Sequence, residues 1–354
     1  MGRRESKWKG IAFALAAAAL FGASTPAAKA LLPQIPPVLL AGLLYLGSGA
    51  GLGFYWLGRR AGKVPLREAG LKRKDLLWLA LVIGFGGMLG PVLLMWGLAR
   101  TAASSTALLL NLEGVFTAGL AWFVFKENFD RRIALGMVLI TLGGISVTWL
   151  GKPGLGVPWG ALGVIGACLA WAIDNNLTRK LSASDPVQIA ALKGLGAGMV
   201  TTALALGLGQ TLPGPQTVLA AGALGLFGYG ISLVFFIQAL RRVGTARTGA
   251  YFSTAPFLGA LASILWLGER AGPGFLIAAL LMAGGVWLHM TEHHEHVHEH
   301  PEFEHEHRHV HDEHHQHSHA PGIALTEPHS HWHRHKTLMH SHPHYPDLHH
   351  QYGH

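Results

Sequence analysis

The stretch TALLLNLEGVFTAGLAWFVFKE, residues 106–127, begins with twenty residues that carry a single charge, at Glu113. A helix needs about 20 predominantly apolar residues to cross the roughly 30 Å hydrocarbon core of a bilayer, so this stretch predicts a transmembrane helix. Similar stretches recur up to residue 290, separated by short basic clusters. They predict ten membrane-spanning helices, over 9–31, 37–57, 76–98, 104–125, 133–150, 159–179, 187–207, 217–239, 246–267 and 273–290.

The composition favours a membrane protein and disfavours other classes. Half of the residues are hydrophobic and only 13% are charged. The net charge of +8 is placed in short loops rather than on one face, which argues against a nucleic-acid partner. The single cysteine, Cys168, excludes a disulfide framework. The loops contain no P-loop and no cluster of nucleophiles or metal ligands. We therefore expect no enzyme activity, and no cofactor required by the membrane core.

The distribution of Lys and Arg predicts the orientation. With the N-terminus in the cytoplasm, nineteen Lys and Arg residues fall on the cytoplasmic side, and only Arg100, Lys152 and Arg270 fall on the other. Because cytoplasmic loops carry the excess of basic residues, we expect both termini in the cytoplasm. The predicted location is the plasma (inner) membrane, crossed many times.

The two halves of the chain share a plan. GLARTAASSTALLLNLEGVFTAGLAWFVFKEN (97–128) and ALRRVGTARTGAYFSTAPFLGALASILWLGER (239–270) each hold a helix end, a short link, an apolar helix and a terminal Glu, at Glu127 or Glu269. Residues 8–29 likewise align with residues 159–180, so we expect the Ala-rich start to be a helix rather than a cleaved signal peptide. An odd number of helices per half predicts inverted repeats, as in many secondary transporters.

These stretches resemble the EamA-type branch of the drug/metabolite transporter superfamily. TALLLNLEGVFTAGLAWFVFKE is similar to the family signature, and TAASSTA (101–107) and TGAYFSTAPFLGALASILWLGE (248–269) fit the same pattern. Gly114 departs from it, since the family has proline there. The resemblance implies an all-α integral membrane fold with ten helices in two inverted five-helix repeats, and export or exchange of small solutes. The expected domains are 1–150, 151–290 and a tail, 291–354.

Polar and aromatic residues within the predicted helices define a candidate path for substrate and coupling ion. The path comprises Glu113, Asn111, Lys193, Trp96, Tyr45, Asp174 and Tyr251. Ionisable groups at membrane depth are costly and usually face a cavity or a partner. Glu113 would carry a proton, meet a cationic substrate group, or serve as a structural carboxyl. Lys193 would pair with Glu113, bind an anionic substrate or reach toward the headgroups. For Lys29 and Asp174, near helix ends, an interfacial role is favoured.

The tail has a different composition. All 24 histidines lie at or after His289, and few apolar residues accompany them, which predicts disorder. Neutral imidazole is a ligand for Ni, Zn, Co and Cu, so the tail is expected to bind divalent metal at several exchangeable sites. The candidate ligands are His293, His294, His296, His298, His300, His305, His307, His309, His311, His314, His315, His317, His319, His329, His331, His333, His335, His340, His342 and His344.

The favoured function is a secondary transporter of a small organic metabolite, regulated by metal on the tail. Direct efflux of Ni, Co or Zn is the alternative, although the first 288 residues contain no histidine that would line a metal path. A metal-sensing membrane protein without transport is a third reading. The expected partners are the lipid bilayer, a small-molecule substrate and divalent metal ions, and a homodimer is compatible with the sequence.

Overall fold

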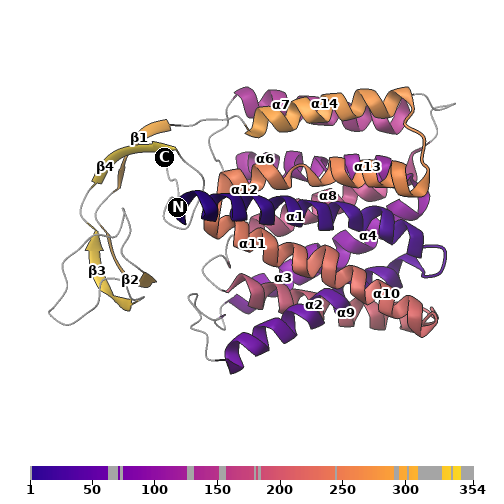
Figure 1. The fold of residues 1–354 in the computed structure, drawn as a ribbon, viewed down its shortest axis with the longest axis horizontal. Helices are drawn as coiled ribbons and strands as arrows, with labels where there is room; N and C mark the ends of the chain where they lie inside the picture. The colour runs from indigo at the N-terminus through magenta and orange to yellow at the C-terminus, as the bar shows by residue number, and fades with distance from the viewer. Residues whose placement is uncertain are drawn as a thin grey trace.

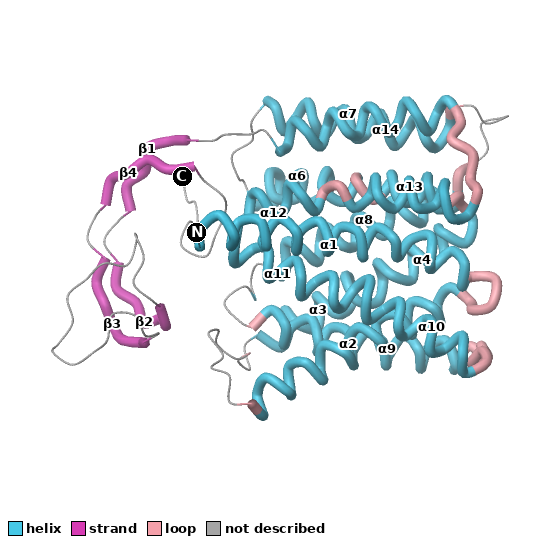
Figure 2. The backbone as a smooth tube through the Cα atoms, in the orientation of Figure 1, coloured by secondary structure: helices cyan, strands magenta, loops and turns pink. Residues whose placement is uncertain are grey.

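The computed structural model describes residues 2–62, 71, 75–125, 131–150, 157–178, 181, 185–243 and 245–290, and four short segments of the tail. Up to residue 290 the described chain forms a bundle of helices, which Figures 1 and 2 show side on. The first half contains α1 (Gly2–Leu31), α2 (Pro37–Ala61), α3 (Leu76–Val82), η2 (Ile83–Leu89), α4 (Gly90–Arg100), α5 (Ala103–Leu109), α6 (Leu112–Phe125) and α7 (Arg131–Trp149).

The second half follows with a similar order. It contains α8 (Trp159–Thr178), α9 (Pro186–Gly207), α10 (Pro215–Gly225), η4 (Leu226–Ile231), α11 (Ser232–Val243), α12 (Thr245–Phe252), α13 (Ala255–Leu267) and α14 (Pro273–Met290). Here η2 and η4 are π-helical segments inside otherwise α-helical stretches. Within the described residues, eight helical stretches are long and apolar enough to cross a membrane, and residues 255–267 and 273–288 form two shorter apolar helices.

Two of the predicted helices contain a π-helical turn. The stretch predicted over 76–98 runs from α3 through η2 into α4, and the one predicted over 217–239 runs from α10 through η4 into α11. Both π segments are glycine-rich, IGFGGML and LFGYGI. A π-turn widens the helix and leaves backbone groups with altered partners, which is why such turns are frequent at functional sites.

Two other predicted helices are broken near their middle. The expected helix 104–125 is divided into α5 and α6 at Leu110 and Asn111, where backbone hydrogen bonds join residues three apart. Asn111 Nδ2 donates to Leu108 O at 2.9 Å and so competes with the regular helical ladder. The expected helix 246–267 is divided into α12 and α13 at residues 253–254, just before Pro256.

Helices of the two halves pack against each other throughout the bundle. α2 packs along α9 and α7 along α14, at opposite edges in Figure 1, while α4 packs on α8 and α1 on α11 and α13. Glycine allows the closest approach, since a β-carbon on Gly194 would lie 2.6 Å from Gly49 Cα. Large apolar side chains such as Leu265 and Leu280 are exposed on the outside, as a lipid-facing surface requires.

The tail contains four strands among its described residues. β1 (Glu295–His300) pairs with β4 (Leu338–Pro343), and β2 (Phe303–His309) pairs with β3 (His329–His335), both antiparallel. In these segments histidine alternates with other residues with a period of two, which fits an extended strand. The rest of 291–354 lies outside the described residues, so the disorder predicted for the tail as a whole stays a prediction.

The strand register places histidines opposite one another on the backbone. The opposed pairs are His296 with His342, His298 with His340, His305 with His333, His307 with His331, and His309 with His329. His300 and His335 also lie on strands, opposite Leu338 and Phe303. The remaining candidate ligands, His293, His294, His311, His314, His315, His317, His319 and His344, lie outside the described residues.

Candidate functional site

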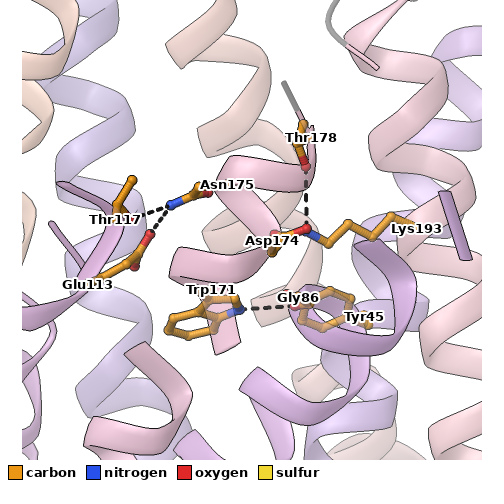
Figure 3. A network of polar contacts seen from close by, with 9 residues as sticks. All are labelled: Tyr45, Gly86, Glu113, Thr117, Trp171, Asp174, Asn175, Thr178 and Lys193. Carbon is orange, nitrogen blue, oxygen red and sulfur yellow. Dashed lines mark hydrogen bonds and ion pairs between the residues drawn. The ribbon is translucent and has the colours of Figure 1, made fainter. Parts of the chain in front are cut away.

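The charged residues on α8 and α9 form an ion pair inside the bundle. Asp174, which is buried, accepts a hydrogen bond from Lys193 Nζ across to α9. It also accepts one from Thr178 Oγ1 at 3.4 Å, one turn further along α8 (Figure 3). A β-carbon on Gly86 would lie 2.1 Å from Asp174 Cγ, so glycine makes room for the carboxylate. The Asp174 side chain is enclosed by η2 and α9 rather than exposed on the outside of the bundle, and the interfacial role favoured for it stays a prediction.

Glu113 lies on the other side of α8, in the first turn of α6. Its Oε1 accepts a hydrogen bond from Asn175 Nδ2 at 2.8 Å, and the same amide donates to Thr117 Oγ1 at 3.4 Å (Figure 3). Lys193 was predicted as a partner of Glu113, but its ammonium binds Asp174 instead. Within the part of the chain that the structure describes, Glu113 forms no ion pair. Among the described residues, the partner of its carboxyl is the neutral amide of Asn175.

The carbonyl of Gly86 connects η2 to two aromatic residues. In the π-turn, Gly90 N donates to Phe85 O, and the next residue, Pro91, has no N–H to donate to Gly86 O. Gly86 O instead accepts hydrogen bonds from Tyr45 Oη of α2 at 2.9 Å and from Trp171 Nε1 of α8 at 3.0 Å (Figure 3). One residue of η2 is therefore tied to both halves of the chain.

Aromatic rings continue from Tyr45 toward the second half. The ring of Tyr45 lies 5.8 Å from that of Tyr229, which belongs to η4. Tyr229 in turn meets Phe21 of α1 edge to face at 5.8 Å, and Phe21 lies 5.6 Å from Phe252 of α12. The two π segments are thus linked through a row of rings, next to the polar residues of α6, α8 and α9.

Three of the predicted path residues lie outside this network. Asn111 is buried at the break between α5 and α6, where it donates to Leu108 O and contacts Met282 Sδ at 3.8 Å. Trp96 stacks under Arg100 at 4.2 Å near the end of α4. Tyr251 lies on α12, and its carbonyl accepts a hydrogen bond from Thr254 Oγ1. The structure gathers Glu113, Tyr45, Asp174 and Lys193 and leaves these three apart.

Sequence reasoning missed the roles of Thr117, Asn175, Trp171 and Gly86. Asn175 and Trp171 stand out in the sequence only as a polar or aromatic residue of α8, with no partner indicated. A signal was present for Gly86, since Pro91 follows it by five residues in a glycine-rich helix. A proline at this spacing leaves the carbonyl of a π-turn without a donor, and a buried carbonyl requires one from elsewhere.

A bundle of apolar helices that holds a carboxylate and an ion pair between its helices belongs to the class of polytopic membrane transport proteins. The model of the EamA-like transporter family matches residues 8–149 and again residues 158–291. The chain therefore belongs to the EamA-like transporter family and carries its domain twice. It is a membrane transporter, and the resemblance inferred from the sequence is confirmed.

Related proteins agree with this assignment. An uncharacterized transporter of Methanothermobacter thermautotrophicus is 28% identical over 295 residues, covering 77% of this chain and 84% of the relative. The uncharacterized inner membrane transporter YedA of Escherichia coli K12 is 26% identical over 234 residues, covering 64% of this chain and 72% of the relative. A crystal structure of 18% identity covers 80% of this chain and 95% of its own with a TM-score of 0.57, which shows a shared fold.

Proposed function

We propose that this chain is a secondary transporter that exports or exchanges a small organic metabolite across the plasma membrane. The observation that supports the proposal is how Glu113, Asp174 and Lys193 are paired between α6, α8 and α9. Lys193 neutralises Asp174, while the carboxyl of Glu113 accepts a hydrogen bond from the neutral Asn175 amide and forms no ion pair within the described part of the chain. A carboxyl at membrane depth with a neutral partner is suited to take up a proton or a cationic group of the substrate.

The proposed architecture is ten spanning helices in two inverted five-helix repeats. If the two halves are exchanged, α4 corresponds to α11 and α8 to α1, so the packing of α4 on α8 corresponds to that of α11 on α1. The packing of α6 on α8 corresponds in the same way to that of α13 on α1. The pairs α2 with α9 and α7 with α14 convert into themselves. The π segments and the helix breaks also recur at matching positions. These regularities support a pseudo-twofold axis with the substrate held between the halves.

In the proposed orientation both termini are cytoplasmic, as the excess of Lys and Arg indicates. The tail would then collect Ni, Zn, Co or Cu at the cytoplasmic mouth and regulate transport. Cross-strand histidine positions such as His298 with His340 support this role, because they bring ligand-bearing residues of distant segments together. The proposed transport site lies within one chain, and the proposal is compatible with either a monomer or a homodimer.

Metal efflux is the second candidate function, and the tail is what favours it. The membrane core argues against it, since residues 1–288 contain no histidine and only one cysteine. Soft and borderline divalent metals are carried by imidazole and thiolate ligands. We therefore prefer an organic solute as cargo. The third reading, a sensor that does not transport, would leave the small-molecule content of the medium unchanged when the gene is deleted.

The test compares cells that express the full chain, Glu113→Gln and the chain ending at Met290. Mass spectrometry of the medium is expected to find at least one small organic metabolite that accumulates with the full chain and is lost with Glu113→Gln. Glu113→Asp is the matched control, because it keeps the carboxyl. A fall in cellular nickel, cobalt or zinc that requires both Glu113 and the tail would establish metal efflux instead.

A further inference from the structure

At the corner between α4 and α5, the C-terminal end of one helix lies next to the N-terminal end of the other. α4 ends at Arg100 and α5 begins at Ala103, and Thr101 between them is extended, with φ −132° and ψ 153°. The last carbonyls of α4 and the first N–H groups of α5 therefore have no partners within their helices. This corner lies at the end of the bundle opposite the tail strands (Figure 1).

Lys29 of α1 binds the carbonyl side of the corner. Its Nζ donates to Leu98 O at 2.6 Å and to Thr101 O at 2.8 Å. An ammonium at a helix C-terminus also interacts favourably with the helix dipole. The Lys29 side chain binds the end of α4, and the interfacial role favoured for it from its position stays a prediction.

Glu269 binds the N–H side of the same corner. Its Oε1 accepts from Ala103 N at 2.7 Å and its Oε2 from Ser104 N at 2.8 Å. Gly268, which ends α13 with φ 68°, turns the chain so that Glu269 reaches across. The corner belongs to the first family domain and Glu269 to the second, so this contact joins the two domains at one end of the bundle.

We infer that Glu269 is a gate residue, which holds this end of the transporter shut by binding the α4–α5 corner, and that Lys29 is a positioning residue, which keeps the corner where Glu269 binds it. The inference rests on the proposed transport function. Alternating access requires the two domains to part at each end in turn. At this end they can part only if the Glu269 carboxylate releases Ala103 and Ser104. Lys29 lies in the same domain as the corner and holds the corner in place through Leu98 O and Thr101 O. In the proposed orientation this is the extracytoplasmic gate, closed in this structure.

A gate residue and an ordinary helix cap differ in what their removal does to the protein. A cap that served stability alone would, when removed, make the protein easier to unfold without changing which side of the membrane reaches its interior. A gate residue, when removed, shifts accessibility toward the extracytoplasmic side. The two cases are distinguished by labelling from each side, and no knowledge of the transported solute is required.

The experiment uses a cysteine reporter in the full chain. Cys168→Ser removes the single native thiol, and Thr25→Cys places a thiol on the same face of α1 as Lys29. Four residues separate the two positions, about 6 Å along the helix, and Thr25 is buried. A membrane-impermeant maleimide is added to intact cells, and in parallel to inside-out vesicles.

Glu269→Gln removes the charge from the hydrogen bonds between the domains, and Lys29→Met removes the ammonium that donates to Leu98 O and Thr101 O. Each variant is expected to raise labelling from outside by about tenfold, because charge-assisted hydrogen bonds are lost, and to lower labelling from inside.

Arg270→Gln is the matched control, because it removes an exposed neighbouring charge and should leave both rates unchanged. Glu269→Asp retains the charge but is one methylene shorter and cannot reach both Ala103 N and Ser104 N, so it serves if Glu269→Gln fails to insert, with a smaller rise in outside labelling expected. Unchanged labelling of the inserted variants, or an equal rise from both sides, would overturn the gate. A rise without solute export would retain the gate and reject the proposed function.

Discussion

Pro91 follows Gly86 by five residues and leaves the carbonyl of Gly86 without a donor from its own helix. Tyr45 and Trp171 supply the missing hydrogen bonds from α2 and α8. Since the two donors come from different family domains, the π-turn η2 is positioned by both. The same turn lets Gly86 face Asp174, so the helix irregularity and the buried ion pair occupy one place.

The two donors to Gly86 O are expected to act as a unit. Tyr45→Phe and Trp171→Phe should each lower the free energy of unfolding by about 1 kcal/mol, because one donor still satisfies the carbonyl. The double variant leaves a buried carbonyl unpaired and should cost about 1–3 kcal/mol beyond the sum. Unfolding of the purified protein in detergent measures this cycle, and simple additivity would contradict the shared role.

Removing Lys193 is expected to be more damaging than removing both members of its pair. Lys193→Met leaves the Asp174 carboxylate buried without a counter-ion, which typically costs about 3–5 kcal/mol. The double variant Lys193→Met with Asp174→Asn should recover most of this loss. The measurement is the fraction of protein that remains folded after extraction and heating. A double variant no more stable than Lys193→Met would show that the unpaired Asp174 carboxylate is not the cause of the loss.

Two glycines of η2 provide a matched comparison. A β-carbon on Gly86 would collide with the Asp174 carboxylate, whereas one on Gly84 meets nothing within 4 Å. Gly86→Ala should therefore displace Asp174 from Lys193, destabilise the protein by about 1–3 kcal/mol and reduce export. Gly84→Ala should have little effect on either. Equal behaviour of the two variants in thermal unfolding and export assays would contradict the packing described around Asp174.

The tail and the membrane core are expected to have separable activities. The full chain should bind several equivalents of nickel or zinc, measured by calorimetry at neutral pH, and binding should weaken as the pH falls below about 6 because imidazoles protonate. The chain ending at Met290 should lose this binding and retain insertion and export. Export that is abolished by the truncation at every metal concentration would show that the tail is required for transport itself.

The sequence was sufficient to predict an all-helical membrane core and the family, because both depend on local patterns. Apolar stretches set the spans, and TALLLNLEGVFTAGLAWFVFKE carries the family resemblance. Partners across helices were not predictable in the same way. Lys193 is nineteen residues from Asp174 and lies on another helix. The periodicity of the sequence does not predict that Lys193 contacts Asp174 or that Glu113 contacts Asn175. The break at Asn111 was also missed, since it depends on one side chain competing for a backbone carbonyl.

The contact of Gly49 with Gly194 has a mechanical consequence. The two backbones touch there with no side chains between them, one from each family domain. The helices cannot come closer at this point, and further along the same two helices Leu46 packs against Gly198 and Thr202 against Gly42. In a rearrangement that preserves this contact, the two domains turn about it, and the two ends of the molecule move in opposite senses.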